Sequence, residues 1–514
     1  MRRCGGCSWG CTPRTDRCRA QSARGYNTPV KNSRSNAPNL RPSIEHLRAR
    51  HGARFKWYAL GTVMVGTVAA LLAATTINVA IPGLMRAFAV GQERAQWLSA
   101  GFMAAFTVFM LLTHWAVARY SFRNTYIAAL ALLLVSSVVG GFAGKFELLL
   151  AMRIVQGAAA GVMQPLAGIL IYRAFPPDRL GRAIGVFGFG VVLAPALGPT
   201  LGGVLMDAFT WRAIFFLSLP FCLAGIGLAL RLLPVIQPPP AQSPFDWLGF
   251  VLVATAMPCM LNGMVDLHDH GLRHAATLSY LALAAVLAAL FLWRQARVSH
   301  PIIDPRLFRR RQFALGSLVA FIYGMGLFGS TYVLPVFAQS VQQYTPARSG
   351  LLLMPAGLLL ALTIPVAGHL SDRYPPRWIT MGGLALFAAS FALLSLASLE
   401  TSFLVFAAWI ALGRVGLGMI MPALNIGALK GIEQDRINQA SSIFNFSRQF
   451  GGAIGISVIG IFLEARINSN LAGASGDAAR RVAIARGYDE TFLALACLFA
   501  VALVASYFMR PRTR

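Results

Sequence analysis

The chain consists mainly of long apolar runs separated by short connections that carry most of its charge. Of its 514 residues, 56% are hydrophobic and only 12% are charged, which is about half the charged fraction of a typical soluble domain. An apolar run of about 18 to 25 residues is long enough to cross a bilayer as a helix. The sequence therefore predicts an all-α integral membrane protein.

The apolar runs predict 14 transmembrane helices. They are 58–84, 95–117, 125–142, 148–172, 184–206, 214–233, 248–265, 278–293, 314–337, 351–370, 379–397, 403–424, 442–463 and 492–508. We expect two six-helix bundles with two inserted central helices. The expected division is a basic, disordered cytoplasmic tail (1–56), an N-terminal bundle (57–233), two inserted helices and a cytoplasmic linker (234–311), a C-terminal bundle (312–510) and a short tail (511–514).

The two groups of six runs repeat each other weakly. Arg119-x-x-x-Arg123 follows the second run, and Arg373-x-x-x-Arg377 follows the tenth. Arg153-x-x-x-Gly157 in the fourth run matches Arg414-x-x-x-Gly418 in the twelfth. Parallel repeats of this kind are typical of a transporter whose halves rock around a central site.

The basic residues predict the orientation and argue against a nucleic-acid partner. The net charge is +27, and most Arg and Lys residues of the short connections follow the even-numbered runs. Cytoplasmic connections carry this excess beside an anionic leaflet, so both termini are predicted to be cytoplasmic. No basic stripe with interleaved aromatic residues lies outside the tail, as binding of single-stranded nucleic acid would require.

Four of the seven cysteines, Cys4, Cys7, Cys11 and Cys18, lie in the N-terminal tail. The Cys4-x-x-Cys7 pair is compatible with zinc, but no second such pair exists and no histidine follows before His46. The tail is rich in Arg, Ser, Asn and Pro, which favours disorder. We expect no metal and no cofactor.

The fifth run carries helix-breaking residues at mid-depth. Pro195 and Pro199 stand among Gly198, Gly202 and Gly203. Neighbouring helices can satisfy the backbone groups that such residues free within a membrane. The glycines also remove side chains from one face, so that another helix can approach closely. We expect a kinked helix that packs tightly and contributes to a hinge.

A buried arginine marks the fourth run. A guanidinium inside a span costs about 2.5 to 3.5 kcal/mol on insertion scales, so Arg153 should face a cavity or a partner. Arg153, Gly157, Gly161 and Gln164 share one helical face. One interpretation puts Arg153 in a water-filled transport cavity. The other has it bonded to backbone carbonyls, with the glycines serving only for packing.

Other polar residues inside the runs are weaker candidates. Thr75 and Asn78 share a face of the first run, and Asn78 needs a partner, either substrate or a neighbouring helix. In the second half, Tyr323 and Asn425 could line a cavity or could be ordinary packed residues.

Seven motifs, in order, resemble those of a known family. They are Asn78-Val79-Ala80-Ile81-Pro82, Ala95-Gln96-Trp97, Arg153-Ile154-Val155-Gln156-Gly157, Gly198-Pro199-Thr200-Leu201-Gly202-Gly203, Trp211-Arg212-Ala213-Ile214-Phe215-Phe216, Phe245-Asp246-Trp247-Leu248-Gly249 and Phe446-Ser447-Arg448-Gln449-Phe450-Gly451-Gly452. Across residues 58–508 the chain resembles the major facilitator superfamily, in its fourteen-helix drug/proton antiporter branch (EmrB/QacA-like).

The resemblance implies export of lipophilic or amphipathic compounds driven by the proton gradient, and it places Arg153 in the transport path. The residues expected along the substrate or proton pathway are Arg153, Gln156, Thr75, Asn78, Gln164, Tyr323, Asn425 and Arg448. The residues expected to act in conformational change are Gly198, Pro199, Gly202, Gly203, Arg119, Arg123, Asp372 and Arg373. Asp372 is expected to form ion pairs with Arg373 and Arg377 that favour the outward-open state.

The chain departs from the family pattern at two places. The first-half counterpart of the Asp372 stretch has His114 and Ala118 where the family has a glycine and an acid, so this lock is predicted to be weakened. The aspartate that usually stands five residues before the asparagine is replaced by Ala73. With that acid missing, Asp207 and His114 are the remaining candidates for proton coupling.

We therefore expect a bacterial inner-membrane exporter that works by alternating access. An uptake carrier or uniporter for a metabolite is the alternative, because fold alone does not fix direction. A membrane enzyme or sensor is disfavoured, since no connection is long enough for a soluble domain. The expected partners are a small-molecule substrate, membrane lipids and a periplasmic adaptor of the kind that relatives in two-membrane bacteria use.

Overall fold

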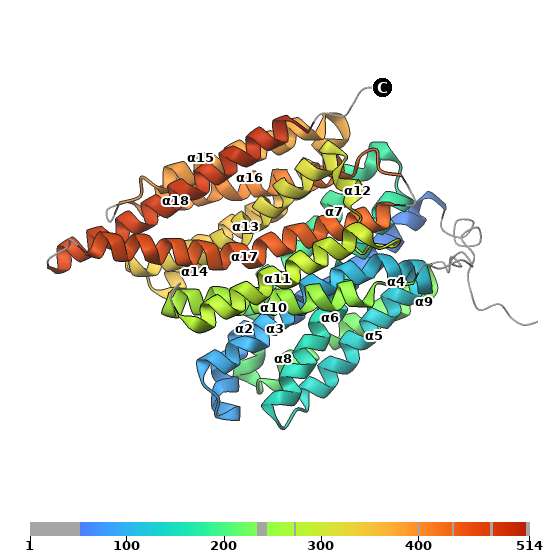
Figure 1. Ribbon diagram of the computed structural model, residues 1–514, viewed down its shortest axis with the longest axis horizontal. Coiled ribbons are helices and arrows are strands. Elements are labelled where there is room, and N and C mark those ends of the chain that lie inside the picture. Colours follow the sequence, from blue (N-terminus) through green and yellow to red (C-terminus); the bar gives the residue numbers. More distant parts are fainter. Residues whose placement is uncertain are drawn as a thin grey trace, which may run out of the picture. The chain divides into compact units, whose positions relative to one another are not determined.

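The computed structural model describes residues 52–233, 244–271, 274–398, 401–433, 436–472 and 476–509. The regular elements within these ranges are all helices, most of them long (Figure 1). The predicted disordered tail with its cysteine cluster, most of the connection before the inserted helices and the final tail lie outside the described residues.

The first half of the chain forms the helices expected from its first six apolar runs. They are α2 (Phe55–Phe88), α3 (Gln92–Phe109) continued by the 3-10 turn η2 (Met110–Leu112) and α4 (Thr113–Tyr120), then α5 (Phe122–Gly141), α6 (Phe146–Ala174), α7 (Leu180–Ala208), α8 (Arg212–Phe216) and α9 (Leu219–Leu232). Short 3-10 turns precede α2 and α7.

The rest of the chain adds the inserted pair and the second six. They are α10 (Trp247–His270), α11 (Ala275–Arg297), the short α12 (Pro305–Phe308), α13 (Arg311–Ser340), α14 (Pro346–Arg373), α15 (Pro376–Leu394), α16 (Phe403–Leu429), α17 (Ile437–Leu471) and α18 (Asp477–Tyr507). Among the described residues, 13 helical stretches are long and apolar enough to cross a membrane. Helix α7, with 29 residues, corresponds to the remaining predicted span and is helical through Pro195 and Pro199.

Equivalent helices pack in the same way in both halves. In the first half α3 packs on α6, α5 on α6, α2 on α7 and α5 on α9. In the second half α14 packs on α16, α15 on α16, α13 on α17 and α15 on α18. The repeat of Arg153-x-x-x-Gly157 and Arg414-x-x-x-Gly418 is therefore a structural repeat. Each glycine meets the second helix of its own half, Gly157 at α3 and Gly418 at α14.

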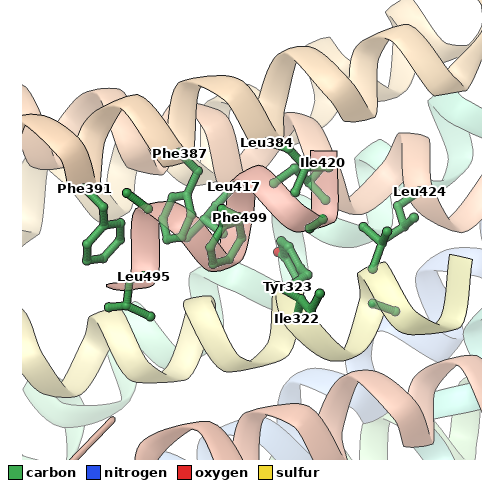
Figure 2. Packing of buried hydrophobic residues seen from close by; sticks show 14 of the residues in the cluster. Ile322, Tyr323, Leu384, Phe387, Phe391, Leu417, Ile420, Leu424, Leu495 and Phe499 are labelled. Carbon is green, nitrogen blue, oxygen red and sulfur yellow. The ribbon is translucent and has the colours of Figure 1, made fainter. Parts of the chain in front are cut away.

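The buried apolar side chains form two large clusters, one mainly in residues 59–233 and the other mainly in residues 307–509. Figure 2 shows the interior of the second cluster, where side chains from α13, α15, α16 and α18 meet. Phe387 and Phe499 pack edge to face with ring centroids 4.4 Å apart, a favoured aromatic geometry. Tyr323 lies in this cluster with 2% exposure, so of its two sequence interpretations the structure favours the packed residue.

Helices α10 and α11 pack against each other, and α10 also packs against α3 and α17 (Figure 1). Phe250 and Met257 of α10 share a buried cluster with Val108 of α3, and Phe450 of α17 packs against it. Helix α11 instead exposes most of its apolar side chains. Exposed apolar side chains on a membrane-spanning helix are suited to lipid.

A buried carboxylate holds the two inserted helices together. Asp246 caps α10 by accepting a 2.9 Å hydrogen bond from the Gly249 backbone N–H. The same side chain accepts from Arg294 Nε at 2.6 Å and from Gln295 Nε2 at 2.8 Å, both in α11. The Phe245-Asp246-Trp247-Leu248-Gly249 motif thus has a structural explanation.

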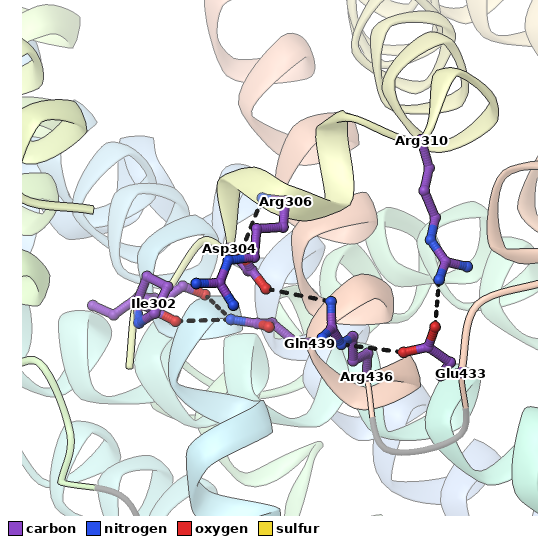
Figure 3. Close-up of polar contacts among 8 residues, drawn as sticks. Ile302, Asp304, Arg306, Arg310, Glu433, Arg436 and Gln439 are labelled. Atoms are coloured by element: carbon purple, nitrogen blue, oxygen red, sulfur yellow. Dashed lines mark hydrogen bonds and ion pairs between the residues drawn. The ribbon is translucent and has the colours of Figure 1, made fainter. Parts of the chain in front are cut away.

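The connection that follows α11 is fixed to the start of α17 by a polar cluster (Figure 3). Gln439 Nε2 donates to the backbone carbonyls of Pro301 and Ile302. Arg310 pairs with Glu433 at 2.5 Å. These contacts tie the inserted pair to the second half.

The predicted runs 442–463 and 492–508 leave a connection between them, but residues 464–488 are largely helical. Helix α17 has 35 residues, which corresponds to about 52 Å at about 1.5 Å per residue and exceeds a hydrocarbon core of about 30 Å. An ion pair between Arg466 of α17 and Glu490 of α18 joins the two helices here. The apolar runs predicted helices that are too short here, because the charged residues of this segment continue the helices beyond the apolar runs.

Candidate functional site

Arg153 is fully buried in the first half, with 1% exposure. Its Nη1 donates to the backbone carbonyl of Ala73 in α2 at 2.9 Å and to Gln156 Oε1 at 2.7 Å, and its Nε donates to the carbonyl of Leu98 in α3 at 3.1 Å. The guanidinium also lies 4.4 Å from the ring centroid of Phe102, which gives favourable cation–π attraction. Arg153 therefore joins three helices through neutral groups.

Gln156 extends this network into the neighbouring helices. Its Nε2 donates to Ser137 Oγ of α5 at 2.9 Å, and Ser137 Oγ lies 3.1 Å from Ser218 Oγ. Every one of these groups is buried. Polar groups at such depth need partners, and here the chain Arg153–Gln156–Ser137–Ser218 supplies them.

One nitrogen of Arg153 remains available. Its Nη2 is buried and has no hydrogen-bond partner among the described residues. Arg153, Gln156, Ser218 and Ala73 are among the residues that line a cavity of about 10 Å³, roughly the space of one water. Ala73, at the position where the sequence resemblance predicts an aspartate, thus lies beside a cation that has no carboxylate partner in the described part of the chain.

The contacts of Arg153 favour the second of its two sequence interpretations, bonding to backbone carbonyls. Its hydrogen-bond partners Ala73, Leu98 and Gln156 all belong to the first half, so these bonds do not place the guanidinium between the halves. Gly157 supports the packing interpretation as well, because a Cβ there would lie 2.2 Å from the carbonyl oxygen of Phe102.

A second set of polar contacts joins the two halves. Asp372, near the end of α14, accepts hydrogen bonds from the backbone N–H groups of Gly181 at 2.6 Å and Arg182 at 2.9 Å. These N–H groups belong to the first turn of α7, whose N-terminus carries a partial positive charge. Asp372 thus acts as a cap supplied to a first-half helix by the second half.

This geometry corrects the expected pairing of Asp372 with arginines. No ion pair joins Asp372 to Arg373 or Arg377 in this described region. Arg373 is exposed, and Arg377 lies over the rings of Trp378 and Tyr507. A helix N-terminus offers two directed donors, and it is these that the carboxylate engages.

The backbones of α7 and α14 touch beside this cap. A Cβ on Gly181 would lie 2.0 Å from the carbonyl oxygen of Gly368, and a Cβ on Gly368 would lie 2.2 Å from that of Gly181. No side chain fits at either position without moving the helices apart. Small residues of this kind allow close helix packing in membranes.

Two further contacts cross between the halves. Tyr172, at the end of α6, donates to the Asn425 backbone carbonyl in α16 at 2.8 Å, and its hydroxyl lies 3.0 Å from Asn425 Oδ1. Gly168 of α6 faces Ser441 of α17, whose Oγ would lie 2.6 Å from an added Cβ. Asn425 is therefore an interface residue. All these contacts lie at helix ends that the charge pattern predicts to be cytoplasmic.

The expected hinge glycines differ from one another. A Cβ on Gly198 would lie 2.2 Å from Thr75 Oγ1 of α2, and one on Gly202 would lie 3.4 Å from Thr76. A Cβ on Gly203 would meet nothing within 4 Å, so close packing was wrongly expected for Gly203. The side chains of Pro199 and Asn78 lie outside the described residues.

The remaining predicted residues have the following positions. Gln164 is buried in α6, and Thr75 donates to the Leu71 carbonyl of its own helix at 2.9 Å. Arg448 of α17 is buried close to Tyr323, and its Nε has no partner within the described chain. Among the predicted pathway residues, the described contacts bring Arg153 together with Gln156 and Tyr323 together with Arg448.

One contact of each of the first-half arginines Arg119 and Arg123 lies within its own half. Arg119 is exposed and lies over Tyr120. Arg123 Nη2 donates to the Leu230 carbonyl of α9 at 3.1 Å, within the first half. Of the coupling candidates, Asp207 has its side chain outside the described residues, and His114 Nδ1 is buried with no partner in the described part.

Sequence reasoning missed Tyr172, Ser137, Gly181 and Gly368. The spacing of Gly181 and Gly185, four residues apart at the start of α7, could have indicated a close helix contact there. Tyr172 and Ser137 gave no comparable indication, because a tyrosine or serine in an apolar run is common.

The fold and these contacts define a polytopic membrane transporter: a repeated helical bundle whose halves meet through separable polar and glycine contacts. The Major Facilitator Superfamily profile matches residues 63–456. The chain belongs to this superfamily.

Individual relatives agree with that assignment. The chain is 29% identical to a multidrug resistance protein B homolog of Mycobacterium tuberculosis, over 79% of this chain and 76% of the relative. It is 26% identical to the tetracenomycin C resistance and export protein of Streptomyces glaucescens, over 80% and 76%. Its fold is similar to the crystal structure of the human organic anion transporter MFSD10, with a TM-score of 0.61, 15% identity and coverage of 88% and 99%.

Proposed function

We propose that this protein exports lipophilic or amphipathic small molecules across a bacterial inner membrane by alternating access. Its family membership and its relatives named for drug resistance support the direction of transport. The observation that carries the mechanism is the capping of α7 by Asp372, because a contact between the halves must break for the other side to open. Both termini are proposed to be cytoplasmic.

The contacts between the halves support an outward-facing state. Asp372 with Gly181, Tyr172 with Asn425, and Gly181 with Gly368 lie at helix ends predicted to be cytoplasmic. Rocking the halves apart there would expose the backbone N–H groups of α7 and the Asp372 carboxylate to water. Because water then hydrates these groups, the net cost of opening is modest, as a cycling transporter needs.

Proton coupling is proposed as the energy source, with uptake or uniport as the alternative. The alternative draws support from Ala73, since no carboxylate whose proton could be exchanged is among the described residues that line the cavity beside Arg153. Coupling without that acid would depend on another titrating group, of which His114 and Asp207 are the candidates. We propose no cofactor.

Substrate and lipid are the proposed partners, since the helices expose broad apolar surfaces. A periplasmic adaptor is a further proposal. The extended helices α17 and α18, which pair through Arg466 and Glu490, offer a surface beyond the apolar layer.

Transport into inverted membrane vesicles tests direction and coupling together. We expect an amphipathic cationic dye to accumulate inside vesicles when the vesicle lumen is made more acidic than the outside. A protonophore should abolish this accumulation. Vesicles carrying Gly181→Leu, whose side chain collides with Gly368, serve as the inactive control. Accumulation that persists with protonophore would reject proton coupling, and accumulation only in right-side-out vesicles would reject export.

A further inference from the structure

We propose that Asp266, His270 and His274 form a binding site for a divalent transition-metal ion, which fastens the end of α10 to the start of α11. Asp266 Oδ1 lies 3.1 Å from His270 Nδ1, and Oδ2 lies 2.9 Å from His274 Nδ1. The potential ligand atoms of the three side chains all lie within 4.8 Å of one another.

These residues lie at the end of one helix and just before the next. Helix α10 ends at His270, and Gly271 follows with a φ of 77°, a conformation that glycine adopts without strain. His274 then stands immediately before α11. The two imidazole rings stack with centroids 4.6 Å apart, so both face the same carboxylate.

Two of the separations, each to a different oxygen of Asp266, are close to those of metal coordination, and the full set of ligand atoms, within 4.8 Å of one another, would draw together around one ion. Zinc binds imidazole nitrogen and carboxylate oxygen at about 2.0 to 2.2 Å, so tetrahedral ligands lie about 3.3 Å apart. The two Asp266–histidine distances of 2.9 and 3.1 Å are within a few tenths of an ångström of this value. Both histidines are about half exposed, so their rings can turn and an ion can enter from solvent.

A hydrogen bond behind the ligands fixes the carboxylate. Thr277, fully buried near the start of α11, donates its hydroxyl to Asp266 Oδ2. Such outer contacts orient metal ligands. The donor set of two imidazoles and one carboxylate suits zinc and similar transition ions, whereas calcium and magnesium prefer oxygen ligands alone.

Metal binding at Nδ1 requires the ring proton of each histidine to leave that nitrogen. Each Nδ1 faces a carboxylate oxygen, so the neutral ring carries its proton there when no metal is bound. The ion takes the Nδ1 lone pair, and the ring proton moves to Nε2, so that the ring stays neutral. Three protein ligands leave one position for water.

Zinc titration of the full-length purified protein tests the site independently of transport. Cys4, Cys7, Cys11 and Cys18 are replaced by serine in every sample, because thiolates also bind zinc, and no histidine tag is used. We expect one equivalent of Zn²⁺ at micromolar concentration, and a higher thermal unfolding midpoint in its presence. His270→Ala with His274→Ala should lose both effects, while His300→Ala, which removes an exposed histidine elsewhere, should retain them.

A more conservative variant keeps all three ligands. Thr277→Val should weaken zinc binding by about 10- to 100-fold, the usual effect of losing an outer contact. Zinc binding by the double histidine variant with the affinity and stoichiometry of His300→Ala would overturn the proposal. Failure of the parent protein to bind zinc would also overturn it.

Discussion

The Nη1 atom of Arg153 lies 2.9 Å from the backbone carbonyl oxygen of Ala73. An acid at position 73 would place its carboxylate next to the same guanidinium, since both residues line one cavity. Within the described residues, the alanine at the position where the resemblance predicts an aspartate and the unpartnered Nη2 of Arg153 therefore belong to the same site.

Ala73→Asp should give Arg153 an ion-pair partner. We expect the double-mutant cycle of Ala73→Asp with Arg153→Ala to show coupling, because removing one partner of a buried pair costs about 3 to 5 kcal/mol. Thermal unfolding in detergent measures the four proteins. Additive effects of the two substitutions would show that the new carboxylate does not reach Arg153.

Arg153→Ala should abolish transport while the protein still inserts into the membrane. The substitution leaves the carbonyls of Ala73 and Leu98 without their donor and separates three helices. Dye transport and membrane yield are measured together, with Arg212→Ala as the control because that arginine is exposed. Flux at the wild-type level in Arg153→Ala would show that transport does not require this arginine.

Asp372→Ala should shift the protein toward the inward-facing state. Loss of a helix cap costs about 0.5 to 2 kcal/mol, which corresponds to roughly a 2- to 30-fold change in population. Reaction of a cysteine placed at Ser441, which is buried against Gly168, with a membrane-impermeant reagent in inverted vesicles reports the opening. Arg373→Ala is the matched control, since that neighbour is exposed. Equal labelling of both variants would contradict a role for the cap.

Gly198→Leu should stop cycling, and Gly203→Leu should not. A side chain at Gly198 collides with Thr75, whereas one at Gly203 meets nothing within 4 Å. Both substitutions replace glycine by leucine in the same helix. A difference in turnover between them in the vesicle assay therefore reports on the contact between Gly198 and Thr75. Similar activity in both variants would show that the approach of α7 to α2 is not needed.

Asp246→Ala should destabilise the inserted pair. The buried carboxylate accepts from Gly249, Arg294 and Gln295, and its removal leaves a partly buried cation, at a cost of about 3 kcal/mol. The unfolding midpoint in detergent measures this loss. Asp304→Ala, at a more exposed ion pair, is the comparison and should have a smaller effect.

The membrane fold could be predicted from the sequence because span length and polarity are set by the bilayer itself. The cost of burying Arg153 could also be predicted, and backbone carbonyls were one of its two expected kinds of partner. The sequence could not say which carbonyls, because every residue carries one. Asp372 was predicted to be functional from its charge, but arginines were predicted as its partners instead of the N-terminus of α7. The backbone N–H groups of a helix N-terminus can bind a carboxylate only when folding brings the two together. Tyr323 shows another limit of sequence analysis. Its residue type is equally compatible with packing in the core and with lining a cavity.

The meeting of Gly181 and Gly368 has a consequence for how such a protein can diversify. Because main-chain atoms form this seam on both sides, closure there does not depend on the shape of any side chain. Residues deeper in the molecule can therefore be substituted to change substrate specificity, while the contact between the two glycines closes in the same way.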